Sequence, residues 1–91
     1  MGQFLAIHTL PSPATTEEAT PIAKAVKANS SADAYWVSSW LQLNEQGKIT
    51  KIFCQWDAKD AGSIRKIVGK IPQLPTDGIY PMAKVDAEAY R

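Results

Sequence analysis

The segment YWVSSWLQLNEQGKITKIFCQW, residues 35–56, contains two stretches that are rich in aromatic and branched side chains. Such stretches are typical of strands. The residues between them, NEQGK (44–48), have the composition of a turn. We therefore predict a β-hairpin made of Tyr35–Leu43 and Ile49–Trp56, and this hairpin is the centre of the predicted fold.

The predicted hairpin has a definite register. A five-residue loop places Leu43 opposite Ile49. Counting back from that pair predicts three further pairs, which are Trp40 with Ile52, Ser38 with Cys54 and Trp36 with Trp56. Because strands alternate with period two, one face is expected to carry the three tryptophans with Ile52 and Cys54. The other face is expected to carry Tyr35, Val37, Leu41, Leu43, Ile49 and Phe53.

A strand and a helix are predicted before the hairpin. The apolar stretch Gln3–Thr9 predicts a strand, which the two prolines of LPSP (10–13) are expected to end. The apolar positions Ala19, Ile22, Ala23 and Val26 have helical spacing. Thr15 with Glu18 has the capping-box pattern, whereas Thr20-Pro21 resembles an N-cap followed by proline. A proline inside a helix costs about 3 kcal/mol, so we expect a loose turn over 16–20 and a regular helix from Pro21.

A second helix and a last strand are predicted after the hairpin. Asp60 is a plausible N-cap, and the apolar stripe that follows consists of Ile64, Ile67, Val68 and Ile71. Pro72 is expected to end this helix. Ile79–Val85 is predicted to be an edge strand, because Pro81 does not suit a central one.

The predicted order is βαββαβ, which with right-handed crossovers gives a ferredoxin-like α+β sandwich. Its mainly antiparallel four-stranded sheet carries two helices on one face. The 91 residues are expected to form one domain, with a core over about 3–85 and a polar tail over 86–91. Because the hairpin has large apolar groups on both sides, we expect a homodimer through the open sheet face.

Composition excludes several classes of partner. Ten Lys plus Arg balance nine Asp plus Glu, so no basic arm or patch indicates nucleic acid or a membrane surface. No apolar run is long enough to span a bilayer. The N-terminus does not resemble a signal peptide, and the one cysteine allows no intramolecular disulfide, so a cytoplasmic location is expected.

Three stretches resemble a family of small bacterial ferredoxin-like proteins of unknown function that includes a nickel-binding member. They are WVSSW (36–40), KIFCQWDAKD (51–60) and LPTDGI (74–79), with weaker support from HTLP (8–11). The family usually has tyrosine at positions 40 and 56, and Ala-Pro-Asp at 58–60. The resemblance implies a dimeric α/β-barrel-like protein and points to nickel as a possible ligand.

One sheet edge is expected to gather the polar candidates, namely His8, Trp36, Trp56, Asp57, Asp60 and Asp77. His8, the only histidine, is a candidate base or metal ligand, or an ordinary hydrogen-bonded residue. Nickel suits imidazole with carboxylates, so His8 and Asp57 are the candidate metal ligands, completed by water or the dimer mate. Asp60 and Asp77 have simpler explanations as a helix cap and a turn residue.

Aromatic residues suggest a ligand pocket. The expected lining is His8, Tyr35, Trp36, Trp40, Cys54 and Trp56, although core packing explains the tryptophans equally well. A buried inert thiol is the simpler interpretation of Cys54, since no nearby cation is evident. The resulting hypotheses are a binding protein for nickel or a small ligand, a cofactor-independent monooxygenase- or isomerase-like enzyme, and a purely structural module.

Overall fold

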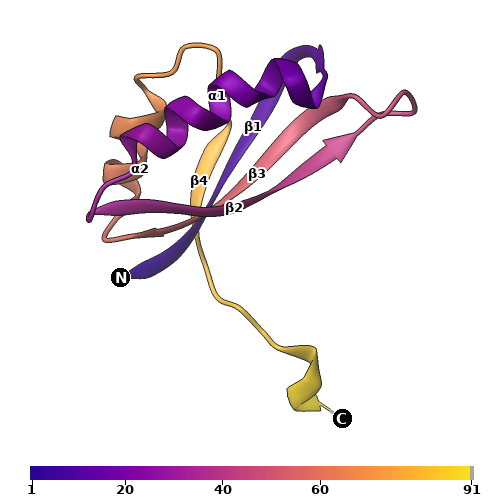
Figure 1. Ribbon diagram of the computed structural model, residues 1–91. Coiled ribbons are helices and arrows are strands. Elements are labelled where there is room, and N and C mark those ends of the chain that lie inside the picture. Colours follow the sequence, from indigo (N-terminus) through magenta and orange to yellow (C-terminus); the bar gives the residue numbers. More distant parts are fainter. Residues whose placement is uncertain (91) are drawn as a thin grey trace.

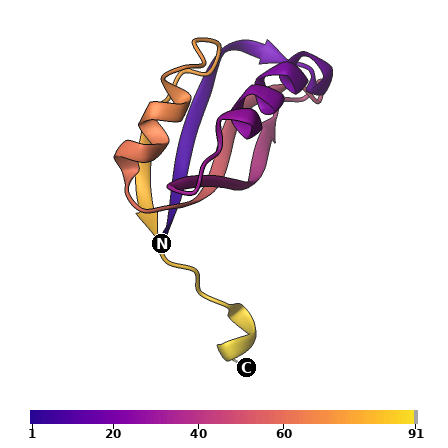
Figure 2. The ribbon, with the colours of Figure 1, turned by 60° about the vertical axis from the view of Figure 1, so that its left-hand side comes forward.

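The computed structural model describes residues 1–90 and confirms the predicted ferredoxin-like order. The elements are β1 (Gly2–Ala14), α1 (Thr16–Asn29), β2 (Ala34–Leu43), β3 (Ile49–Ala58), α2 (Ala61–Val68), β4 (Gly78–Met82) and the short 3-10 helix η1 (Ala87–Tyr90). The strands form an antiparallel sheet in the order β2-β3-β1-β4. Figures 1 and 2 show α1 and α2 on the same face of the sheet. We call this the covered face and the other the open face.

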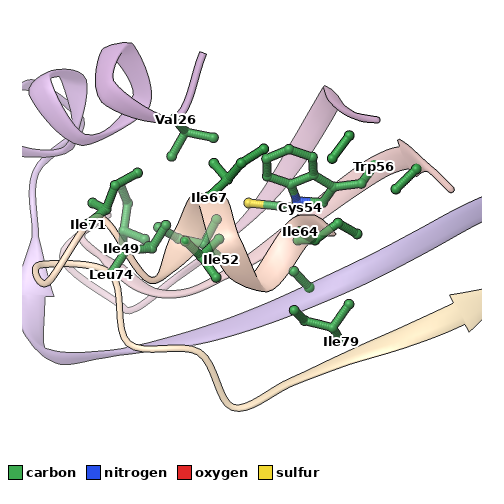
Figure 3. Packing of buried hydrophobic residues seen from close by; sticks show 14 residues of the cluster. Val26, Ile49, Ile52, Cys54, Trp56, Ile64, Ile67, Ile71, Leu74 and Ile79 are labelled. Carbon is green, nitrogen blue, oxygen red and sulfur yellow. The ribbon is translucent and has the colours of Figure 1, made fainter. Parts of the chain in front are cut away.

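The core lies between α2 and the covered face. Alternate residues of β3, from Ile52 to Ala58, are buried there, and Ala6 and His8 of β1 lie beside them. The apolar stripe of α2 supplies Ile64, Ile67 and Val68. Figure 3 shows the large side chains of this cluster, with Trp56 and Cys54 among the isoleucines. The alternation predicted for β3 from Ile52 onward is thus confirmed.

The hairpin carries two register shifts that the sequence did not predict. Its end pairs, Leu43 with Ile49 and Trp36 with Trp56, are confirmed. Between these pairs, β3 has an unpaired extra residue at Thr50, which shifts the register by one position. β2 has an unpaired extra residue at Val37, which restores the original register. An extra residue in each strand is the mark of a β-bulge, and the two bulges compensate each other.

The bulges exchange the faces of several residues. Trp40 lies opposite Phe53 rather than Ile52, and its side chain is 78% exposed. Leu41 lies opposite Ile52 instead, and Ile49 is fully buried in the core. The prediction that the three tryptophans share one face is therefore wrong, because a one-residue slip reverses the side of every residue between the bulges.

β1 is longer than predicted. It continues to Ala14 and includes Pro11 and Pro13, so the expected end at Thr9 is wrong. Thr9 pairs with Lys51, and the next pair is Ala14 with Ile49, across a register shift. Both prolines fall in the irregular interval between these pairs, where a missing N–H interrupts no regular ladder.

α1 begins earlier than predicted. The helix starts at Thr16, with Pro21 inside it, so the expectation of a regular helix only from Pro21 is wrong. The Thr15 hydroxyl accepts from the Glu18 N–H at 3.1 Å, and the Glu18 carboxylate accepts from the Thr15 N–H at 2.9 Å. This complete capping box satisfies the N–H groups of Thr15 and Glu18, which would otherwise lack partners, and this explains the early start.

β4 is shorter than predicted, ending at Met82 rather than Val85. It is an edge strand, which is where Pro81 was expected. Within the predicted polar tail, Ala87–Tyr90 form η1, and Arg91 lies outside the described residues.

Candidate functional site

An open cavity of about 290 Å³ lies between α1 and the covered face of the sheet. The wall formed by α1 includes Ala19, Ala23 and Val26, whose helical spacing places them on one side. The wall formed by the sheet includes Trp36 and Cys54, two residues predicted to line a ligand pocket. The alanines of α1 are small, so they leave space between this helix and the sheet.

The bulge at Val37 decides which residues of β2 reach the cavity. Ser39 lies opposite Cys54 and Leu41 lies opposite Ile52, and all four residues line the cavity. In the register predicted from the sequence, Ser39 and Leu41 would have faced the other side. Sequence reasoning therefore missed both residues, because no local signal in WVSSW marks the position of the bulge.

A short chain of polar contacts crosses the cavity wall. The Trp36 indole N–H donates to the Ser39 hydroxyl at 2.9 Å and lies 3.1 Å from the Ser38 carbonyl oxygen. The Ser39 hydroxyl in turn donates to the Cys54 sulfur at 3.2 Å. These contacts fix the indole against the wall and hold the Cys54 sulfur, as an acceptor, at the lining of the cavity.

Cys54 is a poor nucleophile in this setting. Burial raises the pKa of its thiol, although the hydrogen bond from Ser39 lowers it slightly. A thiol that stays protonated at neutral pH neither attacks nor coordinates a metal readily. The expectation of an inert buried thiol agrees with these contacts.

The cavity is neutral. None of the described side chains that line it is charged, and its polar groups are hydroxyls, one thiol and one indole. A charged molecule would lose its hydration there without gaining a charged partner. The arrangement therefore suits a neutral, mainly apolar ligand.

His8 lies outside this cavity, buried against the loop that joins α2 to β4. Its side chain is fully buried, with Nδ1 2.9 Å from the Pro75 carbonyl oxygen and 3.2 Å from the Thr76 hydroxyl. Because a carbonyl oxygen only accepts, Nδ1 carries the proton and Nε2 carries a lone pair. That Nε2 has no hydrogen-bond partner among residues 1–90, and burial lowers the pKa of the imidazole, so His8 is mainly neutral at pH 7.

The structure does not bring His8 and Asp57 together. Asp57 pairs with Gln3, five residues from His8 along β1, a separation of about 16 Å at strand spacing. The two side chains also point to opposite faces, because five is an odd number of residues. The expected pairing of these residues as metal ligands within one chain is therefore wrong.

The other acidic candidates are also separated. Asp60 caps α2, where its carboxylate accepts from the Ser63 N–H at 2.8 Å, and this bond lowers its pKa. Asp77 accepts a hydrogen bond from the Thr9 hydroxyl, at the His8 end of the sheet. Because β1 runs antiparallel to β3, the end of one lies beside the start of the other. The expected gathering of His8 with Trp56 and Asp57 at one edge is thus wrong.

The remaining aromatic candidates lie apart from the cavity. Trp40 is on the open face, and Tyr35 is half exposed with the Lys27 ammonium 3.7 Å from its ring centre. Trp56 is fully buried in the core, and its indole N–H has no hydrogen-bond partner. Of the six residues predicted to line one pocket, only Trp36 and Cys54 line this cavity.

Residues 1–90 contain no cluster of three or more His, Cys, Asp or Glu side chains that could hold a metal ion. A protein site for a divalent transition metal normally gathers several such ligands. The described residues of a single chain therefore do not fit a complete nickel site.

The fold and the cavity together define a small ferredoxin-like α+β protein with an apolar cavity beneath α1. The chain belongs to the family of SCO4226-like nickel-responsive proteins, whose family model matches residues 4–82. This membership confirms the resemblance inferred from the sequence. No curated protein and no solved structure matched the chain. In the part of the chain that the structure describes, no helix has the length and apolar character needed to cross a membrane.

Proposed function

We propose that this protein is a homodimeric ligand-binding module of the nickel response, and that it holds a compact neutral apolar molecule in the cavity beneath α1. The cavity itself carries the proposal, since it combines an apolar wall with the fixed Trp36–Ser39–Cys54 contacts. Family membership supports the link to nickel. The free, buried Cys54 suits a reducing compartment such as the cytoplasm.

The size of the cavity limits the ligand. Its volume of about 290 Å³ is near the lower limit of small-molecule pockets, which begin at about 300 Å³. An apolar cavity of about 150 Å³ is enough for benzene. A one- or two-ring aromatic compound or a short branched chain therefore fits, and the Cys54 thiol offers it one weak hydrogen bond.

The homodimer is proposed from the open face. Its exposed large apolar side chains include Tyr35, Trp40, Tyr80 and Met82. Figure 2 shows both helices on the opposite face of the sheet, from where the Lys27 side chain of α1 reaches the Tyr35 ring. Leu5 and Phe53 lie between them on the central strands, at positions that alternate with buried residues. A second copy that packs face to face would remove this surface from water, which is the usual reason for such a patch.

Binding is favoured over catalysis. The enzyme alternative required His8 or Asp57 to point into an aromatic cavity, and neither residue lines the cavity beneath α1. The cavity also holds no charged group that would act as a general acid or base. A protonated thiol and hydroxyls such as those of Thr20 and Ser39, which already donate hydrogen bonds, are suited to holding a ligand rather than to transforming it.

Nickel itself is the second candidate ligand, and one observation favours it. The His8 Nε2 has a lone pair and no partner, while Nδ1 is fixed by the Pro75 carbonyl, as in many metal-binding histidines. Residues 1–90 of one chain supply no cluster of ligands around this nitrogen, so further ligands would have to come from water or from a second chain.

The ligand proposal is tested by titrating the protein with toluene and with indole, followed by the indole N–H signals in ¹H–¹⁵N NMR spectra. We expect saturable shifts of the Trp36 signal and little change for Trp40. Ala23→Leu narrows the cavity and should weaken binding at least about tenfold, about 1.4 kcal/mol. Lys24→Leu places the same side chain on the exposed side of α1 and is the matched control. Equal binding by both variants, or no saturable shift in the wild type, contradicts the proposal.

The nickel candidate is tested by calorimetric titration with NiCl₂. Wild-type protein should release or absorb heat with a micromolar midpoint, and His8→Gln should abolish this response. Circular dichroism confirms that the variant is folded. Absence of heat in the wild type excludes direct nickel binding and leaves the apolar ligand as the only candidate.

A further inference from the structure

The chain after β4 forms an arm, residues 83–90, that extends away from its own fold. In Figures 1 and 2 the arm leaves the end of β4 and continues past the sheet on the side away from α1 and α2. Every residue from 83 to 90 is exposed. Two large apolar side chains are among them, Val85 at 70% and Tyr90 at 76% exposure.

The arm is locally ordered despite its exposure. Asp86 precedes η1, its carboxylate accepts from the Glu88 N–H at 3.1 Å, and its carbonyl accepts from the Ala89 N–H at 3.1 Å. These bonds set the direction of a short helical turn that ends in Tyr90. Tyrosine is enriched at protein–protein interfaces, so the exposed Tyr90 at the end of this turn is suited to a contact with another protein surface.

The root of the arm lies on the open face. A groove of about 250 Å³ is lined there by Trp40 and Gln55 together with Ala83 and Lys84. Ala83 and Lys84 thus pass on the side of the sheet where Trp40 is exposed. The arm therefore leaves the protein toward the space that a second copy would occupy.

We propose that the arm is exchanged between protomers, so that Val85 and Tyr90 of one chain pack on the open face of a second copy. This inference rests on the dimer in the proposed function. In a two-fold symmetric dimer each contact occurs twice, so the arm of each protomer would pack on the open face of the other. The arm extends beyond the end of its own sheet. The open face of a second copy would offer an apolar surface to Val85 and Tyr90.

The experiment uses dimers of two differently labelled full-length chains. One chain carries ¹⁵N and the substitution Cys54→Ser. The other is unlabelled and carries Cys54→Ser with Tyr90→Cys, to which a nitroxide spin label is attached. Paramagnetic broadening reports ¹⁵N-labelled atoms that lie near the nitroxide, and it arises here only between chains. We expect broadening of the Trp40 indole signal and the Leu5 and Phe53 amides, with the helix-side Ile64 amide as internal reference.

Each outcome decides the proposal. Broadening of the open-face signals between chains supports it. Broadening seen only when both labels are on one chain shows that the arm folds back, and overturns it. A dimer without broadening in either arrangement also overturns it while leaving the dimer intact. A monomer at all concentrations instead overturns the proposed dimer, and the arm exchange with it.

Removal of the apolar contacts provides an independent measurement. Val85→Ser with Tyr90→Ser should raise the dimer dissociation constant at least about tenfold. Ala87→Ser alters the arm without removing a large apolar side chain and is the matched control. An unchanged dissociation constant in the double variant contradicts the exchange.

Discussion

Trp40 lies opposite Phe53 on the open face of the sheet, whereas Trp36, four residues earlier, lies on the covered face opposite Trp56. In a regular strand, residues four apart share a face. The bulge at Val37 separates them, so the same strand supplies one indole to the ligand cavity and another to the open face. β2 thus links the two surfaces to which we assign function.

The first prediction concerns the open face. Trp40→Ser removes the most exposed aromatic ring of the hairpin and should raise the dimer dissociation constant at least about tenfold, since aromatic anchors dominate many interfaces. The melting temperature of the isolated chain should change little, because the ring is 78% exposed. Sedimentation equilibrium over a range of concentrations measures the effect, with Glu45→Ser in the hairpin loop as control. A Trp40→Ser protein that is as dimeric as the wild type would show that the interface lies elsewhere.

The second prediction concerns pH. Burial lowers the pKa of His8 in the folded state below 6.5, the usual value for a histidine side chain. As the pH falls through 6.5, the unfolded chain gains a proton that the folded chain does not, so the free energy of unfolding decreases. The decrease should approach about 1.4 kcal/mol per pH unit until the folded-state pKa is reached.

Urea denaturation at pH 7.5, 6.5 and 5.5 measures this decrease in the free energy of unfolding. These pH values lie above the pH range in which most carboxyl groups titrate. His8 is the only histidine, so His8→Gln should remove most of the dependence of the free energy of unfolding on pH. This holds whether or not the substitution changes the stability at pH 7.5. A variant that keeps the full wild-type slope would show that His8 is not its source.

The third prediction concerns Cys54. Burial and the raised pKa of the thiol should make its reaction with a disulfide reagent at pH 7.5 at least about a hundredfold slower than that of an unfolded chain. Saturation with toluene should slow the reaction further if the ligand occupies the cavity that Cys54 lines. Rates with and without urea give the first comparison. Equal rates in native buffer and in urea would contradict the described burial.

The fourth prediction concerns the start of α2. Asp60→Ala removes the acceptor of the Ser63 N–H and should lower the melting temperature by a few degrees. Asp60→Asn keeps a side-chain oxygen in place and should retain most of the stability. Differential scanning calorimetry of the three proteins makes the comparison. Equal melting temperatures for the alanine variant and the wild type would mean that the cap does not stabilise the helix.

Local patterns were sufficient for much of the fold. The stripe from Ile64 to Val68, the cap at Asp60 and the turn at residues 44–48 each follow from a few neighbouring residues, and each is present. The turn also places Gly47 at a φ of 74°, a conformation that glycine adopts readily. Such features depend on short-range backbone and side-chain preferences, which the sequence states directly.

Local sequence patterns predicted the candidate site less well than they predicted the fold. Placing His8 and Asp57 at one edge failed because the antiparallel pairing of β1 and β3 sets them at opposite ends and on opposite faces. Placing Trp40 with Trp36 failed because of the bulge. A single inserted residue reverses a strand's alternation, and no residue type in Trp36–Trp40 requires the insertion.

The amino-acid sequence alone determined the order of elements, the family and the presence of unpaired apolar surface, because these depend on periodicity and composition summed over many residues. Only the tertiary structure decided which tryptophan reaches the cavity, that the His8 imidazole is buried in the core, and that residues 83–90 extend away from the sheet. Those outcomes depend on strand register and on contacts between residues far apart in the chain. A register shift of one position moves a side chain to the other face of the sheet and leaves the sequence pattern unchanged.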